Sequence, residues 1–250
     1  MSRLTEDLIN PAQKFFEWDG RKGGFEFWDK SQKTETVKGV KVHVPLPFVF
    51  LFLEKLSTIR GFNDDEQSGY WSNEVMDISK EVMVVRTKKE VTARGIYKNV
   101  IDSKECRGAK FCQSVYVGYK EGGKLVIANM QLTGAALSAG FEFCKSNDIK
   151  KGAIAVKSFV AKKKGDNNYV EPVFTKVPCA PETETAANVL CQELETYLAK
   201  YFKKQKEQNA DINVSDVIIP AENNNTVAHK EESHSQVADI VSPGDDDLPF

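Results

Sequence analysis

The last six residues of the chain combine three kinds of group that protein-binding peptides use. They are Asp245, Asp246, Asp247, Leu248, Pro249 and Phe250. A terminal phenylalanine offers a ring for a small apolar pocket and an α-carboxylate for a lysine or arginine at its rim. The proline stiffens this end, and the three aspartates attract a basic surface. These residues are therefore predicted to form a partner-binding tip.

Basic and aromatic residues are interleaved in four segments. Lys157, Phe159 and Lys163 lie on one face of a predicted strand, whose other face (Ile154, Val156, Ser158 and Val160) is predicted to be core. The other candidates are Trp18, Arg21, Lys22 and Trp28; Arg86, Lys88, Lys89, Arg94, Tyr97 and Lys98; and Tyr116, Tyr119 and Lys120. Cations that meet phosphates and rings that stack on bases are what a single strand of nucleic acid requires. For each aromatic residue, packing in the core is the competing interpretation.

Groups for catalysis are sparse. The glycine-rich segment 20–24 lacks the Gly-Lys-Ser/Thr ending of a phosphate loop and is predicted to be a hairpin turn. Asp64, Asp65 and Glu66 could hold a divalent cation, although a solvated acidic turn is the favoured interpretation. His43 has no evident nucleophile partner, and five scattered cysteines form no zinc-binding pair. We predict a protein without catalytic activity, metal or cofactor.

The net charge of −2 hides a division along the chain. From Gln205 to Phe250 there are two basic and ten acidic residues, which gives −8. The remaining 32 basic and 26 acidic residues give the rest of the chain +6. A basic body joined to an acidic tail is typical of nucleic-acid binders, and a merely solubilising tail is the alternative.

Strands must position most of these groups. Hairpins are predicted over residues 12–30, 82–97, 111–128 and 153–177, further strands over 37–44 and 49–53, and a surface loop over 61–73. Helices are predicted over 132–146 and 181–204. This order indicates a mainly β protein of the α+β class. An oligonucleotide-binding (OB) barrel elaborated with extra hairpins, an internal helix and a C-terminal helix fits it, and a β-sandwich fits nearly as well.

The C-terminal helix is amphipathic, so it either packs on the body or pairs with a second subunit, which leaves a homo-oligomer open. After Lys206 aromatic residues are missing until Phe250, and a polar, acidic composition cannot offset chain entropy. We therefore predict a body over residues 1–206 and a disordered acidic tail over 207–250. With neither a secretory signal nor an apolar run of membrane length, a cytoplasmic location is expected.

Two resemblances add to these predictions. The tip, residues 245–250, resembles position by position that of bacterial single-stranded-DNA-binding proteins, which docks onto replication and repair enzymes. The N-terminal half resembles phage-encoded proteins presumed to bind single-stranded DNA, over residues 10–18, 25–30, 44–48 and 56–62. They imply a protein that coats single-stranded DNA of any sequence during replication, recombination and repair. They also imply that the protein is located in the cytoplasm of a bacterium or of a phage-infected host.

Two other functions remain open on the sequence. A recombination mediator that anneals strands would use the same basic and aromatic residues but would need extensive subunit contacts. A metal-dependent nuclease would be built around Asp64, Asp65 and Glu66.

Overall fold

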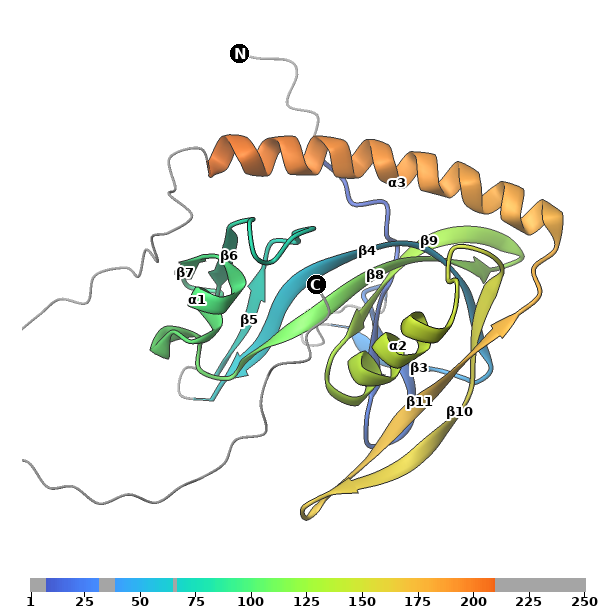
Figure 1. The fold of residues 1–250 in the computed structure, drawn as a ribbon, viewed down its shortest axis with the longest axis horizontal. Helices are drawn as coiled ribbons and strands as arrows, with labels where there is room; N and C mark the ends of the chain where they lie inside the picture. Colours follow the sequence, from blue (N-terminus) through green and yellow to red (C-terminus); the bar gives the residue numbers. More distant parts are fainter. Residues whose placement is uncertain (1–7, 32–38, 65–66, 210–250) are drawn as a thin grey trace, which may run out of the picture. The chain divides into compact units, whose positions relative to one another are not determined.

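The protein is described by a computed structural model over residues 8–31, 39–64 and 67–209. The strands are β1 (Phe15–Asp19), β2 (Gly24–Asp29), β3 (Val40–Val44), β4 (Phe48–Asn63), β5 (Ser68–Ser72), β6 (Met83–Arg86), β7 (Val91–Gly95), β8 (Ala109–Glu121), β9 (Lys124–Leu132), β10 (Ala153–Lys164) and β11 (Asn167–Val177). The helices are α1 (Tyr97–Ile101), α2 (Gly134–Ser146) and α3 (Pro181–Gln208), with a short 3-10 turn η1 (Lys104–Cys106). The described part of the chain is thus mainly β, as predicted (Figure 1).

The strands form one mixed sheet in the order β3-β2-β1-β9-β8-β4-β5-β6-β7, and the β10–β11 hairpin branches from β4. β1 and β9 run parallel, whereas the other neighbours are antiparallel. This path of described strands is not closed into a barrel. The mainly β prediction is therefore confirmed at the level of class, and the sheet itself is open.

β4 is the central strand, with 16 residues. Its first residues pair with β10, most of its length pairs with β8, and its last residues pair with β5. The surface loop predicted over residues 61–73 is wrong, because β4 continues to Asn63 and β5 begins at Ser68. Gly61 allows this continuation: a Cβ at this position would lie 2.3 Å from the carbonyl oxygen of Gly108 on the adjoining segment.

Two hydrophobic cores hold the two parts of this sheet, in addition to the smaller clusters beneath α3. The first is enclosed by strands β1, β2, β4, β8, β9 and β10 together with α2, and its centre is aromatic. Phe16, Phe25 and Phe48 are almost fully buried there and contact one another edge-on or tilted. The second core joins the end of β4 to β5, β6, β7 and α1 around Tyr70 and Met83. Burying each such side chain contributes about 1.5–3 kcal/mol, so each core holds its own part of the sheet.

α3 lies across the sheet on the face away from the aromatic core (Figure 1). Leu194 and Leu198 pack on Leu56, Tyr116 and Ile127, so the helix packs on the body, as favoured from the sequence. It ends at Gln208 rather than at residue 204. The predicted tail is therefore helical at residues 207 and 208, and the tip at 245–250 lies outside the described residues. In the described ranges, no helix is both long and apolar enough to cross a membrane.

Candidate nucleic-acid interface

Four residues on neighbouring strands form a row of cations and one ring. Lys110 of β8 pairs with Arg60 of β4, Arg60 pairs with Trp71 of β5, and Trp71 pairs with Arg86 of β6. Directly paired residues project from the same face of a sheet, so the row presents three cations and an indole side by side. Lys110 and Arg86 are exposed, and Arg60 and Trp71 are half-buried. We call these residues the basic-aromatic row.

The row opens into a surface groove, which we call the outer groove. Arg60, Glu17 and Gln131 line two hollows at once, so the hollows are continuous. One hollow contains Trp71 and Lys110 of the row. The other is lined by Lys14, Phe15, Trp28 and Lys30 at the N-terminal hairpin. Phe15 is 43% exposed and Trp28 is 55% exposed, so both rings are open to a ligand.

A buried polar network lies under this face of the sheet. The Glu74 carboxylate accepts hydrogen bonds from the hydroxyl groups of Ser114 and Tyr116. Asn129 donates to Ser114 at 2.6 Å, and Asn10 donates to the Tyr116 oxygen at 3.3 Å. Burial raises the pKa of Glu74, although both hydrogen bonds and the charge of Arg60 act in the opposite direction. The network ties the segment before β6 to strands β8 and β9 and thereby fixes the floor beside the groove.

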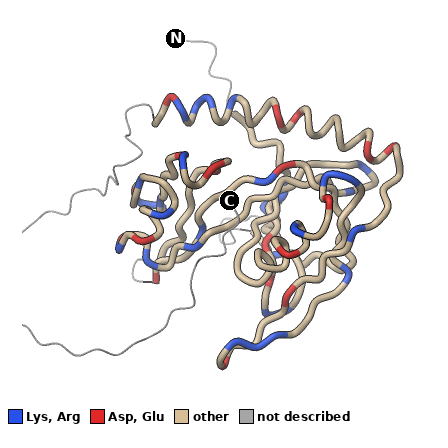
Figure 2. The backbone as a smooth tube through the Cα atoms, viewed as in Figure 1, with Lys and Arg blue, Asp and Glu red and all other residues tan. Residues whose placement is uncertain are grey.

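The β10–β11 hairpin is a basic arm. Every residue from Lys157 to Lys164 is exposed, and Figure 2 shows the concentration of basic residues along the arm. Lys157 and Lys163 project from β10 as expected, whereas Ser158 and Val160, predicted to be core, are exposed; Val160 is 48% exposed. The reason is that β10 leaves β4 after Val156 and pairs only with β11, so both faces of the arm are open; the pairing with β11 also shifts between Val156 and Ser158.

The arm contacts the N-terminal hairpin, which brings two of the predicted sets together. The Phe159 ring lies over Gly23. The Trp18 indole donates to the Val170 carbonyl at 2.9 Å, and the Val170 amide donates to the Gly20 carbonyl at 2.8 Å. Trp18 is therefore half-buried and joins the two hairpins. The exposed Arg21, Lys22, Lys157, Phe159, Lys162, Lys163 and Lys164 form what we call the arm patch.

The third predicted set is only partly in this surface. Arg86 belongs to the basic-aromatic row, and Lys88 and Lys89 lie on the exposed β6–β7 turn. Arg94 is half-buried on β7, and Lys98 is exposed on α1. Tyr97 packs edge-on against Phe111 with 5.5 Å between ring centroids, so its ring supports the second core.

The prediction that the two tyrosines of the fourth set stack on bases is wrong. Tyr116 is completely buried beneath α3, and Tyr119 is 6% exposed in the aromatic core. The Tyr119 hydroxyl donates to Glu121 at 2.7 Å. Both faces of β8 are covered, so both residues are inside although they point to opposite faces. Lys120 is exposed, as expected.

Sequence reasoning missed most of the cations and rings of the groove. The missed residues include Lys14, Phe15, Lys30, Arg60, Trp71 and Lys110. The adjacent aromatics Tyr70 and Trp71 were a strand signal inside the segment assigned as a loop. For Phe15 and Phe16, period-two alternation shows that one is inside but does not show which one.

In the described part of the chain, neither the acidic turn nor His43 forms a metal-binding or catalytic site. Asp64 is exposed, and Asp65 and Glu66 lie outside the described residues. Within the described ranges, no three His, Cys, Asp or Glu residues are placed to hold a metal ion. The His43 ring lies against Gly24, and its Nδ1 is 4.0 Å from a Glu26 carboxylate oxygen. No family model, curated protein or solved structure matches this chain.

Proposed function

We propose that the protein binds single-stranded DNA without sequence preference through the outer groove and the arm patch, and recruits other proteins of DNA metabolism through its C-terminal tip. The observation that carries this proposal is the basic-aromatic row, in which Trp71 lies between Arg60 and Arg86. Guanidinium groups meet phosphates, and an indole face accepts any base. The combination therefore suits a ligand defined by its backbone rather than by its sequence.

The charges of the row are available to a ligand. Arg60, Arg86 and Lys110 form no salt bridge with a described acidic residue. Each such cation that neutralises a phosphate releases counterions condensed on the DNA, which adds a salt-dependent contribution to binding. Binding driven by this surface is expected to weaken steeply as salt concentration rises.

A single strand suits the groove better than a duplex does. Phe15, Trp28 and Trp71 offer faces or edges along the groove, and only unpaired bases can stack on them. A duplex keeps its bases inside and would contact the cations alone. The expected preference for single strands therefore depends on the rings and not on the charges.

We also propose that the body is an elaborated relative of the OB fold whose sheet is open. The sheet encloses one aromatic core, and α2 packs against that core. The hydrogen bonds of Val170 to the N-terminal hairpin bring β11 next to β1 and β2, which are far from it in the strand order. The proposed setting is the cytoplasm of a bacterium or of a phage-infected cell.

The test is a titration of the full chain with fluorescent oligo-dT and with a duplex of equal length in about 0.1 M salt. Single-strand binding that is much tighter than duplex binding is expected. Replacing Trp71 with alanine should weaken oligo-dT binding by about 1–3 kcal/mol, if a base stacks there. Equal affinity for the two forms of DNA in the wild type would remove the proposal.

A further inference from the structure

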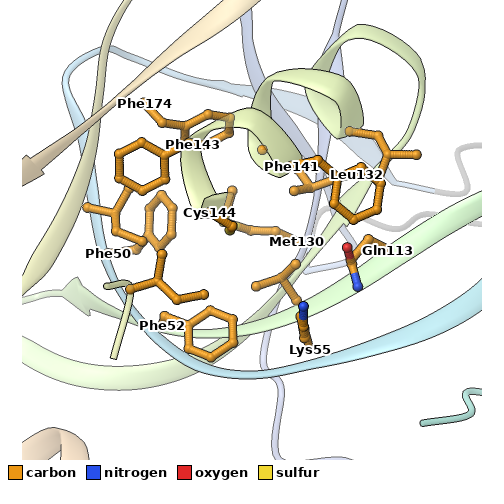
Figure 3. Close-up of a pocket in the computed structure, with 15 residues that line it drawn as sticks. Phe50, Phe52, Lys55, Gln113, Met130, Leu132, Phe141, Phe143, Cys144 and Phe174 are labelled. Carbon is orange, nitrogen blue, oxygen red and sulfur yellow. The ribbon is translucent and has the colours of Figure 1, made fainter. Parts of the chain in front are cut away.

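An apolar pocket lies between α2 and the inner face of the sheet (Figure 3). Five of its fifteen lining residues are phenylalanines, and most of the others are aliphatic. Phe50, Phe143 and Phe174 lie on one side in Figure 3, and Phe141 lies on the other, with Met130 between them. Among the described residues, the pocket shares no lining residue with the outer groove. It is thus a second site, whose chemistry suits a ring rather than a phosphate chain.

A lysine that forms no ion pair with any described residue lines this pocket. Lys55 of β4 lines it next to Gln113 of β8, and both lie on one side in Figure 3. The Lys55 ammonium group has no hydrogen bond or ion pair with any described residue. The elements around the pocket carry four further lysines and two acidic residues. The lysines are Lys145, Lys150, Lys151 and Lys176, and the acidic residues are Glu142 and Asp148. The surroundings are therefore net positive, and they favour an acidic ligand.

An apolar cavity with a cation beside it fits a peptide that ends in a hydrophobic residue. The ring enters among the aromatic side chains, the α-carboxylate meets an ammonium group, and preceding acidic residues meet the outer lysines. The chain itself ends in this way: Asp245 to Asp247 are followed by Leu248, Pro249 and Phe250.

The direction of α3 indicates which molecule supplies that end. The helix begins after β11, where Ala187 packs on Leu51 and Ala153. Its 28 residues span about 42 Å at 1.5 Å per residue. It ends beside the β5–β7 region, where Gln205 hydrogen-bonds Asn73 at 2.8 Å (Figure 1). The chain thus leaves α3 at the end remote from α2. To reach the pocket of its own molecule the tip would have to return over the length of the helix, whereas the pocket of a second copy carries no such requirement.

We propose that the α2 pocket receives the C-terminal tip, residues 245–250, of a second copy of this chain. The proposal deepens the proposed role of the tip in protein recruitment and rests on it. Repetition along a coated strand would link each molecule to the next through one tip and one pocket. Such a link makes binding to long single strands cooperative, whereas an oligonucleotide of one site length is bound without it.

The test mixes two full-length variants without DNA. Phe250→Ala keeps the pocket and removes the ring of the tip, and Lys55→Glu keeps the tip and reverses the charge at the pocket. Sedimentation should show that the wild type associates as its concentration rises and that each variant alone remains monomeric. The mixture should associate again, because one intact tip and one intact pocket are present.

Two further variants separate the pocket from general effects. Cys144→Trp fills the pocket from an exposed position on α2 and should abolish association as Lys55→Glu does. Lys124→Glu makes the same charge change on the exposed β8–β9 turn and should associate like the wild type. A synthetic hexapeptide with the sequence of residues 245–250 should compete, and its C-terminal amide should compete at least about tenfold less well.

Three results would overturn this inference: a wild type that stays monomeric at every concentration, association that survives in Phe250→Ala alone, or a mixture of the two variants that fails to associate. None of these measurements involves DNA or a partner enzyme. A failure of DNA binding or of partner capture is therefore distinguishable from a failure of the tip and pocket to meet.

Discussion

The ring of Phe159 lies so close over Gly23 that a Cβ on this glycine would come within 2.6 Å of two ring carbons. One face of the ring is thus applied to the N-terminal hairpin, while the side chain remains 43% exposed. The contact holds the basic arm against the hairpin at Gly23, where the missing side chain leaves room for the ring. It also leaves part of the ring for a base.

Gly23→Ala should release this contact. The added methyl group collides with Phe159, and the backbone at Gly23 has a φ of +76°, which an alanine adopts only with strain. We expect a loss of about 1–3 kcal/mol in the free energy of unfolding, measured in urea, with weaker oligo-dT binding. Gly20→Ala in the same turn is the matched control, since a Cβ there meets nothing within 4 Å. Equal effects of the two changes would contradict this account.

Phe159→Ala should cost about 1–3 kcal/mol of single-strand affinity, because a stacked base loses its platform. Combined with Trp71→Ala, the two losses should add, since the residues lie on separate parts of the surface. Isothermal titration of both single variants and the double variant tests this. A less stable Phe159→Ala protein that binds oligo-dT with unchanged affinity would show that the ring serves packing alone.

The cations of the row should control the salt dependence of binding. Removal of one phosphate contact by Arg60→Gln, Arg86→Gln or Lys110→Gln should reduce the slope of log K against log salt by about 0.7. Lys203→Gln, on the exposed side of α3, is the control and should leave the slope unchanged. Slopes that are the same in all four variants would place the DNA elsewhere on the protein.

Removal of residues 210–250 should tighten single-strand binding at low salt and have little effect at high salt. This segment contains one basic and nine acidic residues, so it carries −8, and we expect it to compete with DNA for the basic body. Deletion of Phe250 alone leaves every side-chain charge and should barely alter affinity for a short oligonucleotide. It should abolish capture of replication or repair proteins from lysate, and identical captured proteins with and without Phe250 would argue against the tip.

Glu74 should make the protein less stable as pH rises. Burial raises the pKa of Glu74 above its ordinary value of 4.5 in the folded state, so the folded protein holds the proton more tightly than the unfolded chain does. This contribution is complete below the ordinary value and is lost as pH rises through the raised pKa. Glu74→Gln should remove that loss in urea unfolding measured at several pH values. Glu121→Gln is the contrast: Lys14 lowers the pKa of Glu121, so its contribution disappears as pH falls.

The elements that carry their own turn signals could be predicted from the sequence. Gly122 and Gly123 supply positive φ between β8 and β9, and an amphipathic repeat gives α3. β5 could not be separated from a loop, because its glycine and serine residues are also turn residues and its strand character depends on pairing with β4 on one side and β6 on the other.

The candidate site was harder to predict than the fold, because the side to which a strand residue points is set by the layers around it. Tyr116 and Tyr119 alternate as a half-exposed strand would, yet α3 covers one face of β8 and the aromatic core covers the other. On β10 the strand leaves β4 after Val156 and both of its faces become exposed, so Val160 does not follow the pattern of Ile154. The basic-aromatic row joins residues from four strands, so the spacing of these residues along the chain does not predict it.

In the proposed binding mode, β4 sets the distance between the two regions that contact nucleic acid. The arm leaves this strand at Phe48, which pairs with Val156, and the basic-aromatic row crosses it at Arg60, twelve residues later. At about 3.3 Å per residue these points are up to ~40 Å apart along β4. A change that loosens one of these regions would therefore weaken the proposed binding at that region, while the length of β4 would keep the number of nucleotides between the two regions the same.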